Sequence, residues 1–342
     1  MVEVKNLVKV YGRKKAVDGL TFNVEENQVY GFLGPNGAGK STTMNIITGC
    51  LSATEGTVCI NGHDIFEEPY EAKRQIGYLP EQPPLYMDMT PKEYLTFVAQ
   101  AKKIKKASIP SAIDGIMRKT SILNVKDRLI KNLSKGYKQR VGIAGALVGN
   151  PPVIILDEPT VGLDPKQIIE IRSLIKELGK NHTVILSSHI LSEVNSICDK
   201  ILIISRGKLI ADDTPENLTK HFREGSMLNV LVRCGMETAI EVMDKLMAGL
   251  PASEKNIWSS ENAKTDTHLG EVTRFKVPLY NENNTIEGKD IRDSIFKAFG
   301  ERNITVLEMS PEKASLEQVF LELTASSTEE EYHEDEAEEE EM

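Results

Sequence analysis

Residues 34–41 of this 342-residue chain read Gly34-Pro35-Asn36-Gly37-Ala38-Gly39-Lys40-Ser41. The spacing fits the pattern G-x-x-x-x-G-K-[ST], in which glycines let backbone N–H groups turn toward phosphate oxygens. The apolar VYGFL before it predicts a strand, and STTMNIITG after it predicts a helix whose positive end faces the same phosphates. We expect Lys40 to reach the terminal phosphates of a nucleotide, Ser41 to offer its hydroxyl to Mg²⁺, and Thr42 to complete the binding loop. The stretch therefore predicts a P-loop in an α/β domain.

A second motif, Val153-Ile154-Ile155-Leu156-Asp157-Glu158, is an apolar strand that ends in two carboxylates. A parallel sheet presents such residues at its carboxyl edge, where the ligands of α/β domains bind. We expect Asp157 to hold Mg²⁺, directly or through water, and Glu158 to orient or deprotonate an attacking water. Alone, the motif is equally typical of a strand followed by a polar turn, but beside a P-loop it predicts nucleotide hydrolysis.

The first 220 residues predict one α/β domain with a helical insert at about 83–140. Strands are expected within 1–33, and GTVCING at 56–62 predicts two strand arms around a turn. Thr90-Pro91-Lys92-Glu93 supplies an N-cap, a proline at the first helical position and a capping-box glutamate to a helical region at 90–130. Buried strands at 153–156 and 183–188, with a helix at 166–180 between them, predict a parallel sheet. The fold class is thus a P-loop NTPase with an antiparallel β subdomain and a helical subdomain.

Residues 221–324 predict a second, small α+β domain. Strands are expected at 228–233, 271–279 and 304–309, helices at 236–249 and 288–301, and a last helix opens at Ser315. This alternation predicts a ferredoxin-like sheet. Residues 325–342 are expected to be a disordered acidic tail, because a block of like charge with few apolar residues cannot bury a core.

Charge and hydropathy limit the classes of partner. The net charge is −10, but residues 329–341 hold ten of the 51 acidic residues, so the rest of the chain balances 41 acidic against 41 basic residues. Nucleic acid is therefore not an expected partner. No run approaches the ~20 apolar residues of a membrane helix, and the four cysteines lack metal-ligand spacing. A cytoplasmic, soluble protein is expected.

Further motifs, in sequence order, resemble the ATP-binding cassette (ABC) family over about residues 1–220. The family signature has the form LSGGQ, and this chain has Leu133-Ser134-Lys135-Gly136-Tyr137, which departs at the third and fifth positions. The resemblance implies that Ser134 and Gly136 meet a γ-phosphate, that Tyr11 stacks on adenine, and that His189 is the switch histidine at the γ-phosphate. It also implies that Val161-Gly162-Leu163-Asp164 crosses a dimer interface.

One position departs from the family in a way that affects the site. The family has glutamine after an IGYLP-type strand, whereas here Glu81 occupies that position and Gln82 follows it. Either residue could sense the γ-phosphate, and the sequence leaves the choice open.

The resemblance implies an ATP-binding and ATP-hydrolysing subunit of an ABC transporter, with ATP and Mg²⁺ as cofactors. It implies a homodimer or pseudo-dimer of ATPase subunits, each nucleotide touching Lys40 of one chain and Ser134 of the other. A separate transmembrane permease would hold the protein at the cytoplasmic face of the cell membrane. Residues 220–324 resemble the extension of ABC-2-type exporters, which favours export. A non-transport ABC ATPase and a nucleotide-binding module that hydrolyses poorly remain alternatives.

Overall fold

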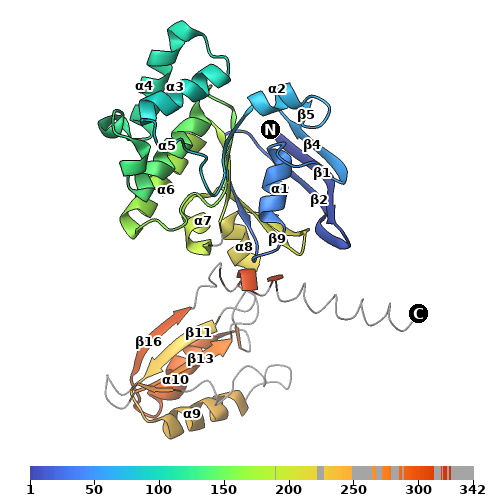
Figure 1. Ribbon diagram of the computed structural model, residues 1–342. Coiled ribbons are helices and arrows are strands. Elements are labelled where there is room, and N and C mark those ends of the chain that lie inside the picture. The colour runs from blue at the N-terminus through green and yellow to red at the C-terminus, as the bar shows by residue number, and fades with distance from the viewer. Residues whose placement is uncertain are drawn as a thin grey trace, which may run out of the picture. The chain divides into compact units, whose positions relative to one another are not determined.

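The computed structural model describes residues 1–188, 190–221, 227–248, 264–266, 272–278, 285–286, 289–311, 317, 319–321 and 323–324. The chain forms two compact units, one made of Met1–Pro215 with Phe320–Met342 and the other of Glu216–Val319 (Figure 1). Helix α8 (Pro215–His221) begins at the boundary. None of the described helices is both long enough and apolar enough to cross a lipid bilayer.

The first unit is built around a six-stranded sheet with strand order β10-β9-β3-β8-β7-β6. The pairs β3–β8, β3–β9, β7–β8 and β6–β7 are parallel, and β10 pairs antiparallel with β9 at one edge. The bounds are β3 (Val29–Leu33), β6 (Ile76–Leu79), β7 (Val153–Leu156), β8 (Thr183–Ser187), β9 (Lys200–Ser205) and β10 (Lys208–Asp213). All residues of β3, β7 and β8 are buried, which explains their continuous apolar sequences. The predicted parallel sheet is confirmed.

A second, antiparallel sheet belongs to the same unit, and α1 (Lys40–Ile47) lies between it and the central sheet (Figure 1). Its strand order is β2-β1-β4-β5, with β1 (Val2–Tyr11), β2 (Lys14–Val24), β4 (Glu55–Ile60) and β5 (His63–Asp64). One core joins the two sheets through α1, because Met44, Ile46 and Ile47 pack with buried residues of both. Helix α2 (Pro69–Arg74) precedes β6. This core fixes the start of α1 between the two sheets.

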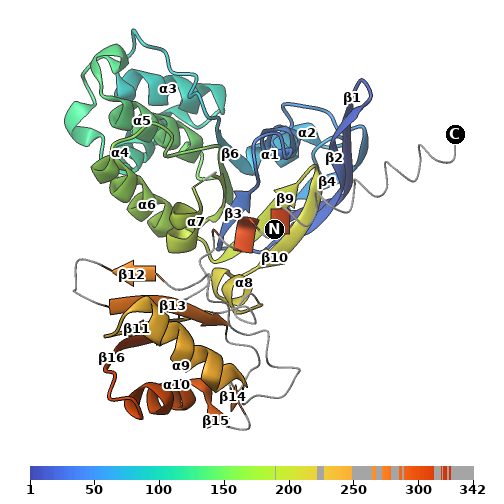
Figure 2. The same ribbon diagram turned by 90° about the horizontal axis from the view of Figure 1, so that it is seen from below.

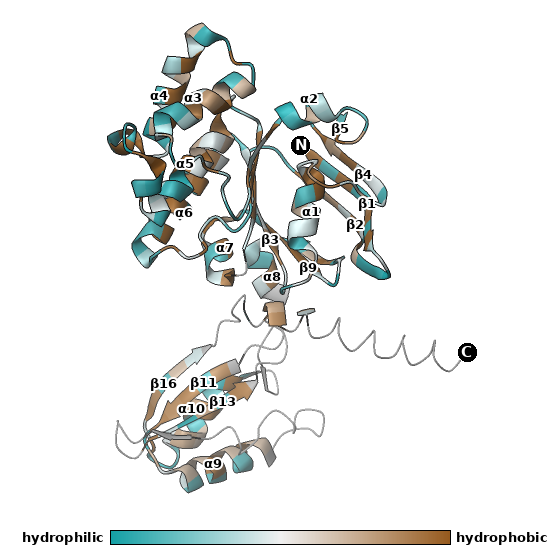
Figure 3. Ribbon diagram, viewed as in Figure 1, coloured by the Kyte–Doolittle hydropathy of each residue, from teal (hydrophilic) through white to brown (hydrophobic). Residues whose placement is uncertain are grey.

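A helical subdomain with its own core lies in the region of the predicted insert, and its last helix extends past the predicted end at about 140. It contains α3 (Pro91–Ala101), α4 (Ile109–Lys119) and α5 (Lys135–Leu147), which gather together in Figure 2. The predicted capping box is present: Glu93 N donates to Thr90 Oγ1, and Thr90 N donates to the Glu93 carboxylate at 2.8 Å. Helix α5 is buried along most of its length, whereas α6 (Pro165–Gly179) buries one face and α7 (Leu191–Ile197) follows β8. Figure 3 shows this contrast, with apolar strands in the centre and polar residues on the outer helix surfaces.

The second unit is an α+β domain with a four-stranded antiparallel sheet of order β12-β13-β11-β16. Its elements run β11 (Met227–Val232), α9 (Met236–Ala248), β12 (Lys264–Asp266), β13 (Val272–Pro278), α10 (Ile291–Gly300) and β16 (Val306–Pro311), with a small hairpin of β14 (Thr285–Ile286) and β15 (Lys289–Asp290). This βαββαβ order is the ferredoxin-like arrangement. Residues of both helices and of the sheet share one core that includes Phe275 and Phe299. Strand β12 was not predicted from the sequence, and the predicted acidic tail at 325–342 lies outside the described residues.

Candidate nucleotide site

The loop at 34–39 leads from β3 directly into α1. Gly39 precedes the helix with φ of 103°, no described side chain caps the helix, and its first turn holds no acidic residue. The first backbone N–H groups of a helix have no partner within the helix, and the helix dipole adds positive charge there. The start of α1 therefore presents N–H donors and positive charge that favour the binding of an anion.

Gly39 is required by its surroundings as well as by its backbone angle. A Cβ atom at this position would come within 2.4 Å of the Ala16 carbonyl oxygen on β2. A φ of 103° is also costly for a residue with a side chain. Strand β2 of the antiparallel sheet therefore lies so close to the loop at Gly39 that there is no room for a side chain at this position.

Lys40 folds back over the loop in this structure. Its Nζ atom donates to the carbonyl oxygens of Gly34 at 2.6 Å and Pro35 at 3.1 Å. Burial lowers the pKa of Lys40, while the nearby carboxylates of Glu158 and Asp157 oppose that shift. Phosphate oxygens would be stronger acceptors for this ammonium than two carbonyl groups.

A pocket of about 600 Å³ gathers most of the predicted nucleotide-binding residues, a volume within the range of small-molecule sites. Lys40 and Glu158 both line it, and of the two candidate γ-phosphate sensors only Glu81 does. Tyr11, half exposed at the end of β1, lies at the same pocket. The residues that line it are Tyr11, Lys14, Ala16, Asn36, Gly37, Gly39, Lys40, Ser41, Thr42, Glu81, Glu158 and Val161.

Asp157 and Glu158 sit at the carboxyl end of β7, next to the end of β8. Ser187 joins the strands: its hydroxyl donates to Asp157 Oδ1 at 2.5 Å and accepts from Glu158 N at 2.9 Å. Asp157 is buried, whereas Glu158 is partly exposed and has a φ of 48°. A non-glycine residue in this left-handed region is uncommon and often marks a functional position.

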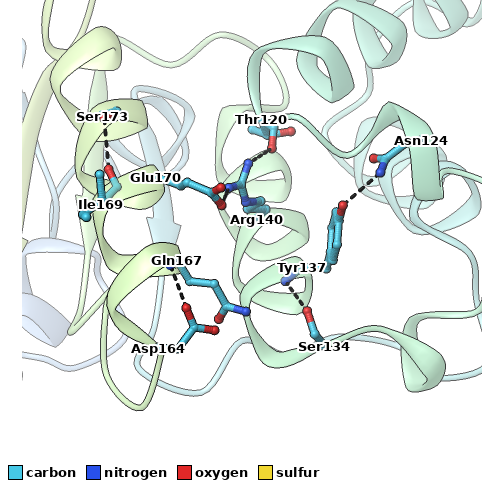
Figure 4. Close-up of polar contacts among 10 residues, drawn as sticks. All are labelled: Thr120, Asn124, Ser134, Tyr137, Arg140, Asp164, Gln167, Ile169, Glu170 and Ser173. Carbon is cyan, nitrogen blue, oxygen red and sulfur yellow. Dashed lines mark hydrogen bonds and ion pairs between the residues drawn. The ribbon is translucent and has the colours of Figure 1, made fainter.

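The predicted signature residues lie at a different pocket, of about 1040 Å³, between α5 and α6 (Figure 4). Ser134 caps α5 by accepting from Tyr137 N, and the side chain of Gln167 covers Gly136 so closely that a Cβ there would be 2.5 Å from it. Arg140 forms an ion pair with Glu170 and thereby ties α5 to α6. Within one chain, Ser134 and Gly136 do not line the pocket that holds Lys40.

The segment 161–164 connects these two regions. Asp164 caps α6 by accepting from Gln167 N at 3.0 Å. The side chain of Lys135 lies over Gly162, because a Cβ atom placed on Gly162 would be only 2.1 Å from Lys135 Nζ. The non-consensus lysine of the signature therefore contacts the loop that follows Glu158.

Some residues of the site were not predicted, and one predicted residue lies outside the described part of the chain. His189 is not described. Lys14 and Ala16 line the nucleotide pocket because β2 returns beside Tyr11, and the Gly12-Arg13 turn of that hairpin was the available signal. Ser187 had no local signal, since its partner Asp157 is 30 residues away.

Comparison with known proteins agrees with this geometry. Residues 17–161 match the family described as ABC transporter. The bacitracin transport ATP-binding protein BcrA of Bacillus licheniformis is 33% identical over 96% of this chain and 98% of its own length. ABC transporter A family member 11 of Dictyostelium discoideum is 31% identical over 90% of this chain, which spans only 35% of that relative. A dimeric ATP-binding cassette in a post-hydrolysis state, bound to ADP and Pi, has a TM-score of 0.57 and 27% identity, covering 63% of this chain and 98% of its own.

The first unit therefore has the fold of a P-loop ATPase cassette. The chain belongs to the ABC transporter family as an ATP-binding subunit.

Proposed function

We propose that the chain hydrolyses ATP with Mg²⁺ and couples hydrolysis to a separate membrane permease. The observation that carries the proposal is the single pocket shared by Lys40, Ser41 and Glu158. A cation for the phosphates, a hydroxyl for a metal and a carboxylate for a water are the groups that nucleotide hydrolysis requires. Lys40 and Ser41 lie at the start of α1, and Glu158 lies at the end of β7. The fold therefore brings together groups that are more than one hundred positions apart in the sequence.

Each residue then has a distinct role. Lys40 exchanges its carbonyl acceptors for the β- and γ-phosphate oxygens, and the backbone at the start of α1 binds the same oxygens. Glu158 orients the attacking water and accepts its proton. Tyr11, at the outer side of the pocket, offers its ring to the adenine.

Ser41 and Asp157 fit a magnesium ion in the chemistry of their donors. Mg²⁺ prefers oxygen ligands and binds nucleotides through one or two protein groups plus phosphates and water. Asp157 Oδ1 is held by Ser187, which fixes the carboxylate at the sheet edge. When bound, the ion would neutralise developing charge on the phosphate oxygens.

The signature residues support a nucleotide sandwich between two copies of the chain. Ser134 is exposed at the start of α5, in a pocket separate from that of Lys40. A second copy, or a homologous subunit, could therefore present its own Ser134 to the phosphates bound at Lys40. A related cassette of known structure is dimeric with ADP and Pi bound.

An exposed aromatic surface on the helical subdomain supports a protein partner. Tyr86, Met87 and Phe97 are 51%, 45% and 42% exposed. The rings of Tyr86 and Phe97 meet edge to face, with their centroids 5.2 Å apart. Exposed apolar groups that cluster in this way mark contact surfaces. We assign this surface to a permease, which would hold the ATPase at the cytoplasmic face of a membrane.

Export is the proposed direction of transport. The alignment with the bacitracin transport protein extends over 330 residues and so includes the C-terminal unit. Residues 220–324, which span most of that unit, are the part of the sequence that resembles the C-terminal extension of ABC-2-type exporters.

Phosphate release by the purified chain tests the ATPase, measured with Mg²⁺ and with excess EDTA. Coupling is tested by identifying a membrane protein that copurifies with this chain and measuring ATP hydrolysis with and without it in vesicles. The proposal would be refuted if Mg²⁺-dependent hydrolysis by the wild-type chain, alone or with the permease, did not exceed that of a Lys40→Ala chain.

A further inference from the structure

Glu193, near the start of α7, is a buried carboxylate that has no role in the site described so far. Its side chain is 3% exposed, and it does not line the nucleotide pocket. A buried carboxylate is costly unless other groups compensate it. Its contacts therefore indicate what it holds in place.

Three elements contribute partners to this carboxylate. Thr160 donates its hydroxyl to Glu193 Oε2 at 2.5 Å, and the Ser188 hydroxyl lies 3.4 Å from the same oxygen. The guanidinium of Arg172 on α6 lies 3.2 Å from Oε1. The carboxylate thus joins the loop after β7, the end of β8 and α6.

Two of these partners are close to the catalytic groups in sequence. Thr160 is two residues after Glu158, in a turn closed by Val161 N donating to Glu158 O at 3.2 Å. Ser188 follows Ser187, which holds Asp157 and the backbone of Glu158. Ser187 therefore fixes the start of the catalytic loop, and Glu193 fixes its continuation through Thr160.

The backbone of Glu158 explains why two supports are needed. Its φ of 48° is an unfavourable conformation for a residue with a side chain, and it persists only when the surroundings enforce it. Thr160 is buried and its hydroxyl is satisfied by Glu193. Without that hydrogen bond the loop can relax and move the Glu158 carboxylate.

We propose that Glu193 is a positioning residue for ATP hydrolysis, which acts through Thr160 to hold Glu158 in its catalytic orientation. The inference rests on the proposed ATPase function and extends it to a residue that does not line the nucleotide pocket. Arg172 balances the charge of Glu193, so that the carboxylate can remain buried beside the loop.

The test compares Thr160→Val with Thr160→Ser in the full-length chain. Valine keeps the shape of threonine but removes the hydroxyl, and serine restores it. We expect Thr160→Val to lower kcat about tenfold or more with KM for ATP changed less than twofold, because a small misplacement of a catalytic group is enough to slow the reaction. Thr160→Ser should return kcat to within threefold of wild type.

A matched control removes another buried threonine hydroxyl far from Glu158. Thr120 is fully buried and donates to the Ile116 carbonyl oxygen at 2.9 Å. Thr120→Val should keep the wild-type kcat, while its melting temperature falls by about as much as that of Thr160→Val. A fall in kcat that merely follows stability in both valine variants would overturn the inference.

Glu193→Asp provides a second test should Thr160→Val not fold. Aspartate keeps a carboxylate for Arg172, but its shorter side chain withdraws from Thr160, so kcat should again fall with KM unchanged. Wild-type kcat in folded Thr160→Val or in Glu193→Asp overturns the positioning role and leaves the ATPase assignment intact. Absence of hydrolysis by the wild-type chain overturns both.

Discussion

Glu158 lines the nucleotide pocket with a backbone φ of 48°, and the proposed hydrolysis depends on its carboxylate. Glu158→Gln should keep ATP binding and lower steady-state turnover by about 10²–10⁴-fold, because the amide cannot accept the proton of water. Phosphate release and nucleotide binding measured on the same preparation separate the two effects. Turnover within tenfold of wild type would remove Glu158 as the general base.

Lys40 should affect binding itself. Its ammonium already lies over the loop, held by two carbonyl oxygens, and phosphates are its stronger partners. Lys40→Ala should therefore abolish the rise in melting temperature that ATP produces in the wild-type chain. Lys180→Ala is the control, because that exposed lysine follows the end of α6 and its ammonium pairs with Glu177 of that helix. A retained ATP-dependent shift in Lys40→Ala would argue against phosphate contact.

At the scale of single residues, the sequence predicts groups that belong to a continuous motif. Residues 34–41 follow from local spacing alone, and the pair Asp157-Glu158 follows from its local pattern taken together with that P-loop. Ser187 and Glu193 do not, since they meet Asp157 and Thr160 across 30 and 33 residues of chain. Such contacts arise from strand order in the sheet, which a local pattern does not encode.

Among the elements, α3 gives the clearest link between sequence and stability. Thr90→Ala removes the hydroxyl that accepts from Glu93 N and should lower the free energy of unfolding by about 1 kcal/mol. Thr90→Ser keeps the cap and should stay close to wild type. Both are measured by urea denaturation, and an alanine variant as stable as wild type would show that the cap contributes nothing.

Elements were predictable where one face is buried and the other is exposed. Helix α6 shows this contrast, and its predicted range of 166–180 is close to the observed one. Helix α5 buries Gly136, Gln139 and every residue from Val141 to Leu147, so its second half has no polar stripe to reveal its period. Strand β12 is only three residues long and leaves no alternation to detect.

At the scale of the whole molecule, the positions of Lys40 and Ser134 decide how the site is completed. The two residues line separate pockets of one chain, and the proposed sandwich brings them together only across two chains. A γ-phosphate between Lys40 of one chain and α5 of the other would hold the dimer, and its loss on hydrolysis would release it. The specific ATPase rate should therefore rise with protein concentration until dimers dominate.

Mixing two inactive variants tests this arrangement directly. Lys40→Ala chains lack the phosphate cation, and Ser134→Arg chains block the opposing surface. A mixed dimer contains one intact site, with Lys40 from the serine variant and Ser134 from the lysine variant, so the mixture should hydrolyse ATP faster than either parent if one site suffices for turnover. Full activity of Ser134→Arg alone, or a rate independent of concentration in a proven monomer, would exclude the sandwich. Failure of complementation alone would leave the sandwich standing, because the proposed dimer has two sites and turnover can require both of them intact.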